Sequence, residues 1–313
     1  MSTLKDIKLA RHAGFCYGVQ RAVDLSIKIK KDNPDVPVYI LGQLIHNNQV
    51  IEDLNRHGIE TIQEIPEKID GICIIRTHGV TPQTIHNLES KGCKIIDATC
   101  PDVKRVQDKA KDLAKDDYRV IIIGKADHPE VIAIKAHADA YSNNEALVIS
   151  SKEEAEKFAE NVTKNAMKIA KNEGETVKNA TPKESKKIGV VIQTTQLIEN
   201  FKEILPVIAE YSKELKVYNT ICSATFKRQQ SAKALAGEVE LMIVVGSKSS
   251  ANTTHLAEII KPIKKTILIE TSEELENYKD LINKAQKIGV TAGASTPEYV
   301  ITEVIKRIGE VNS

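Results

Sequence analysis

The sequence predicts an α/β fold made of three similar small lobes in a pseudo-threefold arrangement around one centre. The first observation is a repeated motif: GFCYGV around Cys16, DATCPDV around Cys100 and NTICSAT around Cys222. Each copy follows an aliphatic run and leads into a helix-like pattern. A motif that recurs in this way predicts repeated copies of one supersecondary unit.

Two further landmarks recur after each cysteine. Apolar runs end in glycine 26, 24 and 24 residues downstream, at Gly42, Gly124 and Gly246. A third apolar run then ends in RTHG, QTT or TAGAS. Because open α/β sheets place ligand sites at the carboxyl ends of their strands, all three units would direct a thiol and polar loops toward a common centre.

The first lobe is expected over residues 1–98. Its first strand leads into the cysteine loop, and Val19, Val23 and Ile27 then recur at helical spacing. VYILG is the second strand, and the helix NNQVIEDLNRHG ends at a C-terminal glycine. GICIIRTHGVT is the third strand. We also expect a helix in residues 297–313 to pack on this lobe.

The second lobe is expected over residues 99–215. Pro101 opens a helix at a favoured early position, and the strand RVIIIG leads to the loop KADHPEV. A Lys/Glu-rich stretch at about 151–187 interrupts the pattern and predicts a solvated helical insertion. The strand IGVVIQTT then resumes the core.

The third lobe is expected over residues 216–296. LKVYNTIC holds its first strand, and a helix runs from Lys227 to Gly237. ELMIVVG has the continuous apolar character of a strand that is buried on both faces. SKSSANTTHL follows as a loop and helix start rich in hydroxyl and amide donors, and IGVTAGASTPE is the last strand and loop.

Composition narrows the class of protein. Hydrophobic residues make up 41% of the chain but aromatic residues only 4%, which predicts a core of aliphatic side chains. A net charge of +1 leaves no large electrostatic footprint for nucleic acid or an anionic membrane. No stretch approaches the roughly 20 apolar residues that span a bilayer, and MSTLKDIKLA lacks the apolar core of a signal peptide. We therefore expect a soluble, cytoplasmic protein.

The cysteines divide into two groups. Five cysteines are an odd number, and a reducing compartment argues against a disulfide framework. Cys73 lies inside the buried-strand pattern ICII and Cys93 precedes a strand, and neither has the flanks of the repeat. We interpret Cys73 as a small core residue and Cys93 as incidental.

Cys16, Cys100 and Cys222 have the pattern of an iron–sulphur site. Structural zinc usually takes four protein ligands, paired at short spacing. Three thiolates from three lobes can hold a cubane and leave one iron open to a substrate, as catalytic metal sites do. The repeat therefore favours one 4Fe–4S cluster per chain, at the centre of the three lobes.

These motifs resemble the 4-hydroxy-3-methylbut-2-enyl diphosphate reductase family, the last enzyme of the methylerythritol phosphate route to isoprenoids. The matching stretches, in family order from residue 14 to 298, are GFCYGVQRAV, IHN, THGV, DATCP, HPEV, QTT, IC-x-AT-x-x-RQ, VVGSKSSANT and GVTAGASTPE. The resemblance implies reductive dehydroxylation of the allylic diphosphate to isopentenyl diphosphate and dimethylallyl diphosphate, at the open iron of the cluster.

The resemblance also implies residue roles. Glu130 of the HPE motif would be the proton source, because a desolvated carboxyl group beside a diphosphate has a raised pKa. Thr194 would contact the substrate oxygen and relay the proton. Six side chains from the polar loops of all three lobes match the family's diphosphate-binding positions: His46, His78, His128, Ser250, Asn252 and Ser295.

Two stretches depart from the family pattern. After GSK the chain reads Ser-Ser-Ala-Asn, where the family often has Asn-Ser-Ser-Asn or Asn-Ser-Gly-Asn, so Ala251 could contribute only its backbone N–H. GKADHPE replaces the more usual GHAGHPE, which changes Lys125 and Asp127. Neither departure removes a cluster ligand or the acid.

Other functions fit parts of the pattern. Quinolinate synthase and the archaeal-type diphthamide radical enzyme resemble the same plan, but the HPE and QTT motifs argue against both. An iron–sulphur sensor would not need the diphosphate donors, and a hydrolytic zinc enzyme would differ in metal and sulphide content. The chain has no flavin or nicotinamide fingerprint, so the resemblance implies a separate ferredoxin or flavodoxin as electron donor. Docking of that donor is the alternative role for residues 151–187.

Overall fold

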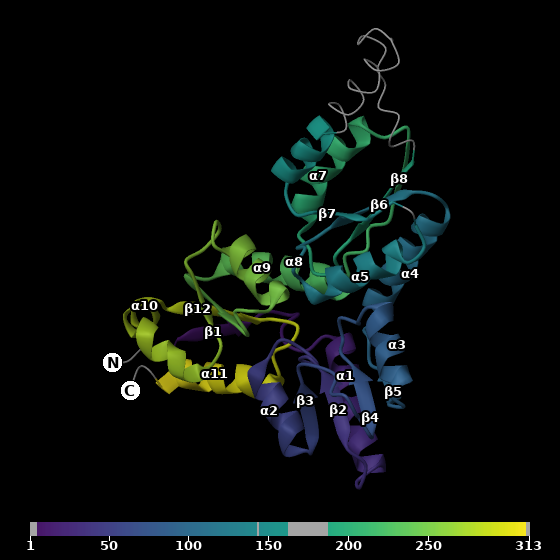
Figure 1. Ribbon diagram of the computed structural model, residues 1–313. Coiled ribbons are helices and arrows are strands. Elements are labelled where there is room, and N and C mark those ends of the chain that lie inside the picture. Colours follow the sequence, from purple (N-terminus) through teal and green to yellow (C-terminus); the bar gives the residue numbers. More distant parts are fainter. Residues whose placement is uncertain (1–4, 143, 162–186, 311–313) are drawn as a thin grey trace. The chain divides into compact units, whose positions relative to one another are not determined.

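The computed structural model describes residues 5–142, 144–161 and 187–310. In this part of the chain the strands form three parallel sheets of four strands each, and helices connect the strands (Figure 1). The predicted α/β fold with three lobes is confirmed. The chain divides into two compact units. The first unit comprises Met1–Thr77, Asn87–Cys100 and Cys222–Ser313, and the second comprises His78–His86 and Pro101–Ile221.

One sheet of the first unit has the strand order β3-β2-β4-β5. The central strand β4 is the predicted ICII strand, and all four of its residues are buried. Asn47 caps the helix that follows β2, because its side-chain oxygen accepts a hydrogen bond from the Val50 N–H at 3.1 Å. The elements of this stretch are α1 (Tyr17–Asp32), β2 (Val38–Leu41), α2 (Asn48–Arg56), β3 (Ile59–Ile62), β4 (Ile72–Ile75), α3 (Pro82–Ser90) and β5 (Lys94–Asp97), and the division between the units falls within α3, after His86.

The other sheet of the first unit has the order β1-β12-β10-β11. All five residues of its central strand β10 are buried, as the ELMIVVG pattern predicts. Its strands are β1 (Asp6–Leu9), β10 (Leu241–Val245), β11 (Thr266–Ile269) and β12 (Lys287–Ala292). Its helices are α8 (Ser223–Glu238), α9 (Ala251–Ile260), the 3-10 helix η2 (Ser272–Tyr278), α10 (Lys279–Lys284) and α11 (Glu298–Glu310).

One strand of this sheet differs from the expected division into lobes. Strand β1 was expected in the lobe of residues 1–98, but it pairs with β12, from Asp6 opposite Lys287 to Leu9 opposite Val290. Helix α11 contributes buried residues to the core beneath β10 and β12, and its Tyr299 hydroxyl also donates to the Asp53 carboxylate of α2 at 3.3 Å, so its packing on the lobe of residues 1–98 stays a prediction. The short loop after β12 returns the helix over its own sheet, as parallel connections usually do. The boundaries at residues 98 and 215 stay predictions.

The sheet of the second unit has the order β7-β6-β8-β9. The inner strands β6 and β8 are almost wholly buried, in agreement with the patterns RVIIIG and IGVVIQTT. Residues 152–161 of the predicted insertion are helical, and residues 162–186 lie outside the described residues. The elements are α4 (Pro101–Lys115), β6 (Arg119–Ile123), α5 (Pro129–Asp139), β7 (Leu147–Ile149), β8 (Lys187–Ile192), α7 (Ile198–Glu210) and β9 (Glu214–Val217).

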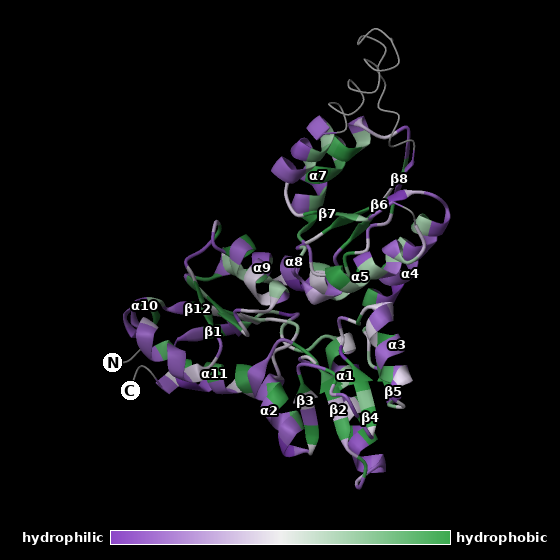
Figure 2. Cartoon of the chain, viewed as in Figure 1, coloured by the Kyte–Doolittle hydropathy of each residue, from purple (hydrophilic) through white to green (hydrophobic). Residues whose placement is uncertain are grey.

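Hydrophobic residues, in green, concentrate on strands such as β4, β6 and β8, whereas the helices are largely hydrophilic purple with hydrophobic residues between (Figure 2). The largest fully buried side chains are Ile and Leu, which confirms the predicted aliphatic core. Loops at the carboxyl ends of the strands carry the candidate polar residues. Among the described helices, none combines the length and the apolar character that crossing a membrane requires.

Candidate active site

The three repeated cysteines all belong to the first unit, and each immediately precedes a helix. Cys16 is the N-cap residue of α1, and its backbone N–H donates to the Ala294 carbonyl at 3.2 Å. Cys222 is the N-cap of α8, where its sulphur accepts from the Thr225 N–H at 3.3 Å. The first backbone N–H groups of a helix have no partner within the helix, so they can donate to a sulphur at the N-cap position, as the Thr225 N–H does.

Two of these thiols converge on one glycine. A Cβ atom added at Gly18 would lie 2.5 Å from the Cys100 sulphur and 4.0 Å from the Cys16 sulphur. Only glycine therefore leaves the space beside these sulphurs open. Cys16, Cys100 and Cys222 are all partly exposed, and no disulfide joins any of the five cysteines, all of which lie in the described ranges.

Cys73 and Cys93 have a different environment. Both are buried, and burial raises the pKa of the Cys73 thiol to about 12, with the neighbouring Cys93 acting in the same direction. A thiol with this pKa stays protonated and is a poor metal ligand. The interpretation of Cys73 as a core residue is confirmed.

Arg228 is a buried cation beside the repeated cysteines. Its side chain is 3% exposed, and Nη2 donates to the Gly14 carbonyl at 2.6 Å. Its Nε and Nη1 are buried and have no hydrogen-bond partner among the described residues. Burial lowers the pKa of the guanidinium, and the charges of Cys16 and Cys222 oppose that shift. Such a cation fits a site that holds several negative charges.

Polar side chains gather at two loops of the first unit. The Ser295 hydroxyl donates to the His46 carbonyl at 3.1 Å, which joins the loop after β12 to the loop after β2. Ser250 is the N-cap residue of α9 but makes no side-chain cap, and Asn252 lies in the first turn of that helix. The buried Asn252 Nδ2 has no hydrogen-bond partner in the described part of the chain. A helix N-terminus with such donors is suited to an anion.

His46 lies in the same region and is half-buried. Burial lowers the pKa of its imidazole, and the positive charge of Arg76 lowers it further. The ring is therefore neutral at pH 7 and can donate from one nitrogen and accept at the other.

Glu130 and Thr194 form a bonded pair in the second unit. The Thr194 N–H donates to one carboxyl oxygen of Glu130 and the Thr194 hydroxyl to the other, both at 2.7 Å. Glu130 lies in the first turn of α5 and is 1% exposed. Burial raises the pKa of this carboxyl group to about 7, although both hydrogen bonds from Thr194 act to lower it. A carboxyl group of this kind can be protonated or ionised near neutral pH.

His128 positions the start of the same helix. It is the N-cap residue of α5, and its Nδ1 accepts from the Glu130 N–H at 3.2 Å. That bond places the proton of the neutral ring on Nε2. The rings of His78 and His128 meet edge to face, with their centroids 5.4 Å apart. The second unit therefore holds two imidazoles and one carboxyl group close together.

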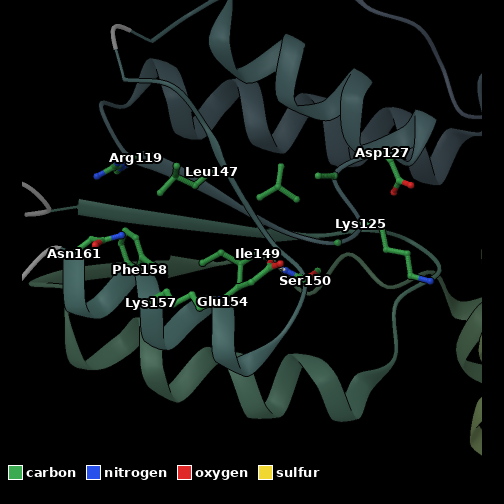
Figure 3. A pocket seen from close by; sticks show the side chains of 13 residues that line it. Arg119, Lys125, Asp127, Leu147, Ile149, Ser150, Glu154, Lys157, Phe158 and Asn161 are labelled. Carbon is green, nitrogen blue, oxygen red and sulfur yellow. Dashed lines mark hydrogen bonds between the residues drawn. The ribbon is translucent and has the colours of Figure 1, made fainter.

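A hollow of about 660 Å³ lies on the sheet of the second unit, the sheet with the order β7-β6-β8-β9 (Figure 3). Lys125 and Asp127, which depart from the family pattern, lie at one end of it, and Arg119 and Asn161 lie at the other. Glu130 and Thr194 do not line the hollow. The two departures therefore change the wall of this hollow rather than the contacts of the carboxyl group.

The candidate residues fall into two groups, one in each unit. The first unit holds seven of them: Cys16, His46, Cys100, Cys222, Ser250, Asn252 and Ser295. The second unit holds four: His78, His128, Glu130 and Thr194. Arg228 is not among the candidates that the sequence predicts, although it stands in the IC-x-AT-x-x-RQ motif, because the motif does not show that this side chain is buried.

Known proteins match nearly the whole chain. A family model described as LytB protein matches residues 7–309. A 4-hydroxy-3-methylbut-2-enyl diphosphate reductase of Clostridium tetani is 43% identical over 310 residues, which cover 98% of this chain but only 44% of that relative. The reductase of the same name in Geobacter metallireducens is 38% identical over 309 residues, which cover 98% of each.

Two solved structures are also similar. One is (E)-4-hydroxy-3-methyl-but-2-enyl diphosphate reductase, described as the terminal enzyme of the non-mevalonate pathway, with a TM-score of 0.67 and 38% identity. The match covers 98% of this chain and 100% of that one. The other is E-1-hydroxy-2-methyl-but-2-enyl-4-diphosphate reductase of Plasmodium falciparum, with a TM-score of 0.80 and 25% identity, covering 97% and 88% of the two chains.

Proposed function

The chain belongs to the LytB family, and from this premise we propose that it reduces 4-hydroxy-3-methylbut-2-enyl diphosphate to isopentenyl diphosphate and dimethylallyl diphosphate. The reaction breaks the allylic C–O bond, forms a C–H bond, consumes two electrons and two protons, and releases water. The observation that carries the proposal is the set of three partly exposed cysteines at helix starts within one compact unit.

Cys16, Cys100 and Cys222 would hold one 4Fe–4S cluster. Three features fit such a group: the open space at Gly18 beside two of the sulphurs, the absence of disulfides among these described cysteines, and the buried donors of Arg228 that lack partners there. When bound, the cluster would supply single electrons and an iron without a cysteine ligand, open to the substrate oxygen.

Glu130 would supply a proton to the departing hydroxyl group. Its raised pKa, about 7, keeps a substantial fraction of the carboxyl group protonated at neutral pH. Thr194 donates to this carboxyl group at 2.7 Å and would orient it, and its hydroxyl can relay the proton to a bound oxygen.

The diphosphate would be bound by neutral donors. Ser250, Asn252 and the first N–H groups of α9 offer a helix N-terminus to its oxygens. Ser295 and His46 lie on adjoining loops of the same unit, and the proposed set also includes His78 and His128, whose rings meet edge to face in the second unit. Because Ala251 lies at the first position of α9, its backbone N–H can serve this role without a side-chain donor.

The proposal includes a separate electron donor, a ferredoxin or a flavodoxin, and a cytosolic location. The absence of disulfides among the five described cysteines favours a reducing compartment, in which iron–sulphur ligands stay as thiols until the cluster is loaded.

The decisive experiment is anaerobic purification with iron and sulphide analysis, followed by mixing with the diphosphate substrate and a chemical reductant. About four irons and four sulphides per chain, together with isoprenoid diphosphate products, are expected. A cluster without turnover would favour a sister cubane enzyme or a sensor. Zinc without sulphide would overturn the role of the three cysteines.

A further inference from the structure

We propose that an acidic one-electron carrier protein docks in a groove between β1 and α8 of the first unit. This inference rests on the proposed function, which needs an external donor of electrons. The groove has a volume of about 780 Å³. One wall is the edge strand β1 with the loop that follows it, and the other is a row of side chains along α8.

The groove carries an excess of positive charge. Lys8, Arg11 and Lys227 line it, and Glu238 is the one carboxylate among its described lining residues. Glu238 is already paired with Lys8 at 3.1 Å. Arg11 and Lys227 are exposed, so their charges are available to a partner. An acidic protein would be attracted to this face and oriented by it.

Two large apolar side chains lie among these charges. Leu9 is 49% exposed and Phe226 is 47% exposed, and both line the groove. An aromatic contact within a charged rim is the composition typical of a transient protein interface. Such an interface lets the carrier protein approach closely, yet binds it weakly enough for the carrier to dissociate quickly.

The groove lies next to the proposed cluster ligands. The Phe226 N–H donates to the Cys222 carbonyl at 3.1 Å, so Phe226 follows that cysteine by one helical turn, which is about 5.4 Å of rise. The wall formed by β1 and its loop is hydrogen-bonded to α8, because the His12 N–H donates to Ser231 Oγ at 3.2 Å. That wall continues to Cys16, four residues beyond His12. An electron entering here would have a short covalent and hydrogen-bonded route to two cysteines.

A second groove of the same unit has the opposite charge balance. It has a volume of about 1110 Å³ and lies along α11. Glu298 and Glu303 line it against Lys306, together with Asp53, which is paired with Arg56. An acidic carrier would be repelled there, so of these two grooves charge favours the one between β1 and α8.

The electron balance sets how often the carrier must dock. A one-electron carrier is oxidised once per encounter, and the reduction of one substrate consumes two electrons. Two reduced carriers therefore dock in turn for each product, and each leaves oxidised. A face that relies on a few charges and one exposed aromatic residue suits such repeated, short-lived contacts.

The test compares two electron sources in the iron-loaded enzyme. The variant carries Arg11→Glu and Lys227→Glu, and the matched control carries Lys261→Glu and Lys265→Glu, which are exposed lysines near α9 and β11. Turnover is measured with reduced ferredoxin, an acidic protein, and separately with reduced methyl viologen, a small cation. At low ionic strength the groove variant should lose at least about tenfold in kcat/KM for ferredoxin and keep its viologen activity. The control should keep both activities.

Equal ferredoxin activity in the groove variant and the control would overturn the proposal. Binding of oxidised ferredoxin, measured by calorimetry, requires no turnover and must weaken in the groove variant, so it decides the question even if that variant loses viologen activity. Failure of the proposed function has a separate signature, because the unsubstituted enzyme would then give no product with methyl viologen.

Discussion

At the scale of single residues, Glu130 combines deep burial with two hydrogen bonds from Thr194. Those bonds stabilise the ionised carboxyl group, yet burial still raises its pKa to about 7. The two effects oppose each other and leave the group able to change its protonation state near neutral pH. A carboxyl group outside such a pocket would be ionised and would be a poor proton donor.

Replacement of Glu130 by Gln should retain the cluster and substrate binding but abolish most turnover, because an amide cannot release a proton at neutral pH. Iron analysis, substrate binding and product formation measure the three properties separately. Turnover like that of the unsubstituted enzyme would remove Glu130 from the mechanism.

The same substitution predicts a pH-dependent difference in stability. Folding raises the pKa of Glu130 from an ordinary value of 4.5 to about 7. Between these values the carboxyl group ionises in the unfolded chain but stays largely neutral in the folded protein, so the free energy of unfolding falls as pH rises through this window. Glu130→Gln stays neutral and should gain stability relative to the unsubstituted protein over that window, on the order of 3 kcal/mol at most. Thermal unfolding from pH 4.5 to 8 measures the gain. Glu210→Gln, an exposed position at the end of α7, is the control and should show no such trend.

Arg228 shows what the sequence could and could not predict at this scale. The repeat draws attention to a cation at the fifth position after each cysteine, namely Arg21, Arg105 and Lys227. In the structure Arg105 pairs with Asp102 and Lys227 is exposed, whereas Arg228 is buried. Adjacent helix positions differ by about 100°, so the direction of a side chain depends on the phase of the helix, which packing sets.

Removal of the Arg228 charge should make the cluster harder to reduce, because a buried cation favours the more negative, reduced state. Arg228→Gln should lower the reduction potential by ~60 mV, the equivalent of a tenfold change in the equilibrium. A redox titration followed by electron paramagnetic resonance gives the value without any turnover. The neighbouring Lys227→Gln is the matched control, and equal potentials in the two variants would exclude a role for the buried charge.

At the scale of elements, the start of helix α1 depends on a glycine for space rather than for backbone freedom. An added Cβ atom at Gly18 would reach within 2.5 Å of the Cys100 sulphur. The strand–cysteine–helix order of this region was predictable from local patterns. The contact with Cys100 was not, because it joins residues that are 82 positions apart in sequence.

Gly18→Ala should therefore displace a thiol and reduce cluster loading severalfold while the chain still folds. Iron and sulphide per chain, together with the helical circular dichroism signal, measure the two effects. Gly237→Ala, in the last turn of α8 where an added Cβ meets nothing within 4 Å, is the matched control and should load normally. Full loading in Gly18→Ala would show that the thiols are not held at the positions described.

At the scale of the whole molecule, the repeat predicted three lobes, and the structure has three parallel sheets. The lobes were predictable because each has its own apolar runs and turn residues, which are local signals. The membership of β1 was not predictable, because alternating and buried patterns identify a strand without identifying its partner. The roles of the individual site residues remain predictions that the variants above test.

Exposure to air should damage the proposed cluster and lower activity, because an iron without a protein ligand is accessible to oxygen as well as to substrate. Activity and the visible absorption band should fall together during aeration, and anaerobic reloading with iron and sulphide should restore both. An enzyme that keeps its spectrum and its activity in air would contradict the open iron.

The pairing of β1 with β12 also dictates the order in which the chain can be assembled on the ribosome. Asp6 is synthesised 281 positions before its partner Lys287. The edge of the nascent strand β1 therefore remains unpaired while those residues are translated, a state that favours wrong pairing and aggregation. Chaperones that bind extended apolar segments can act on β1 throughout that interval, and the synthesis of β12 is the event that lets its sheet close.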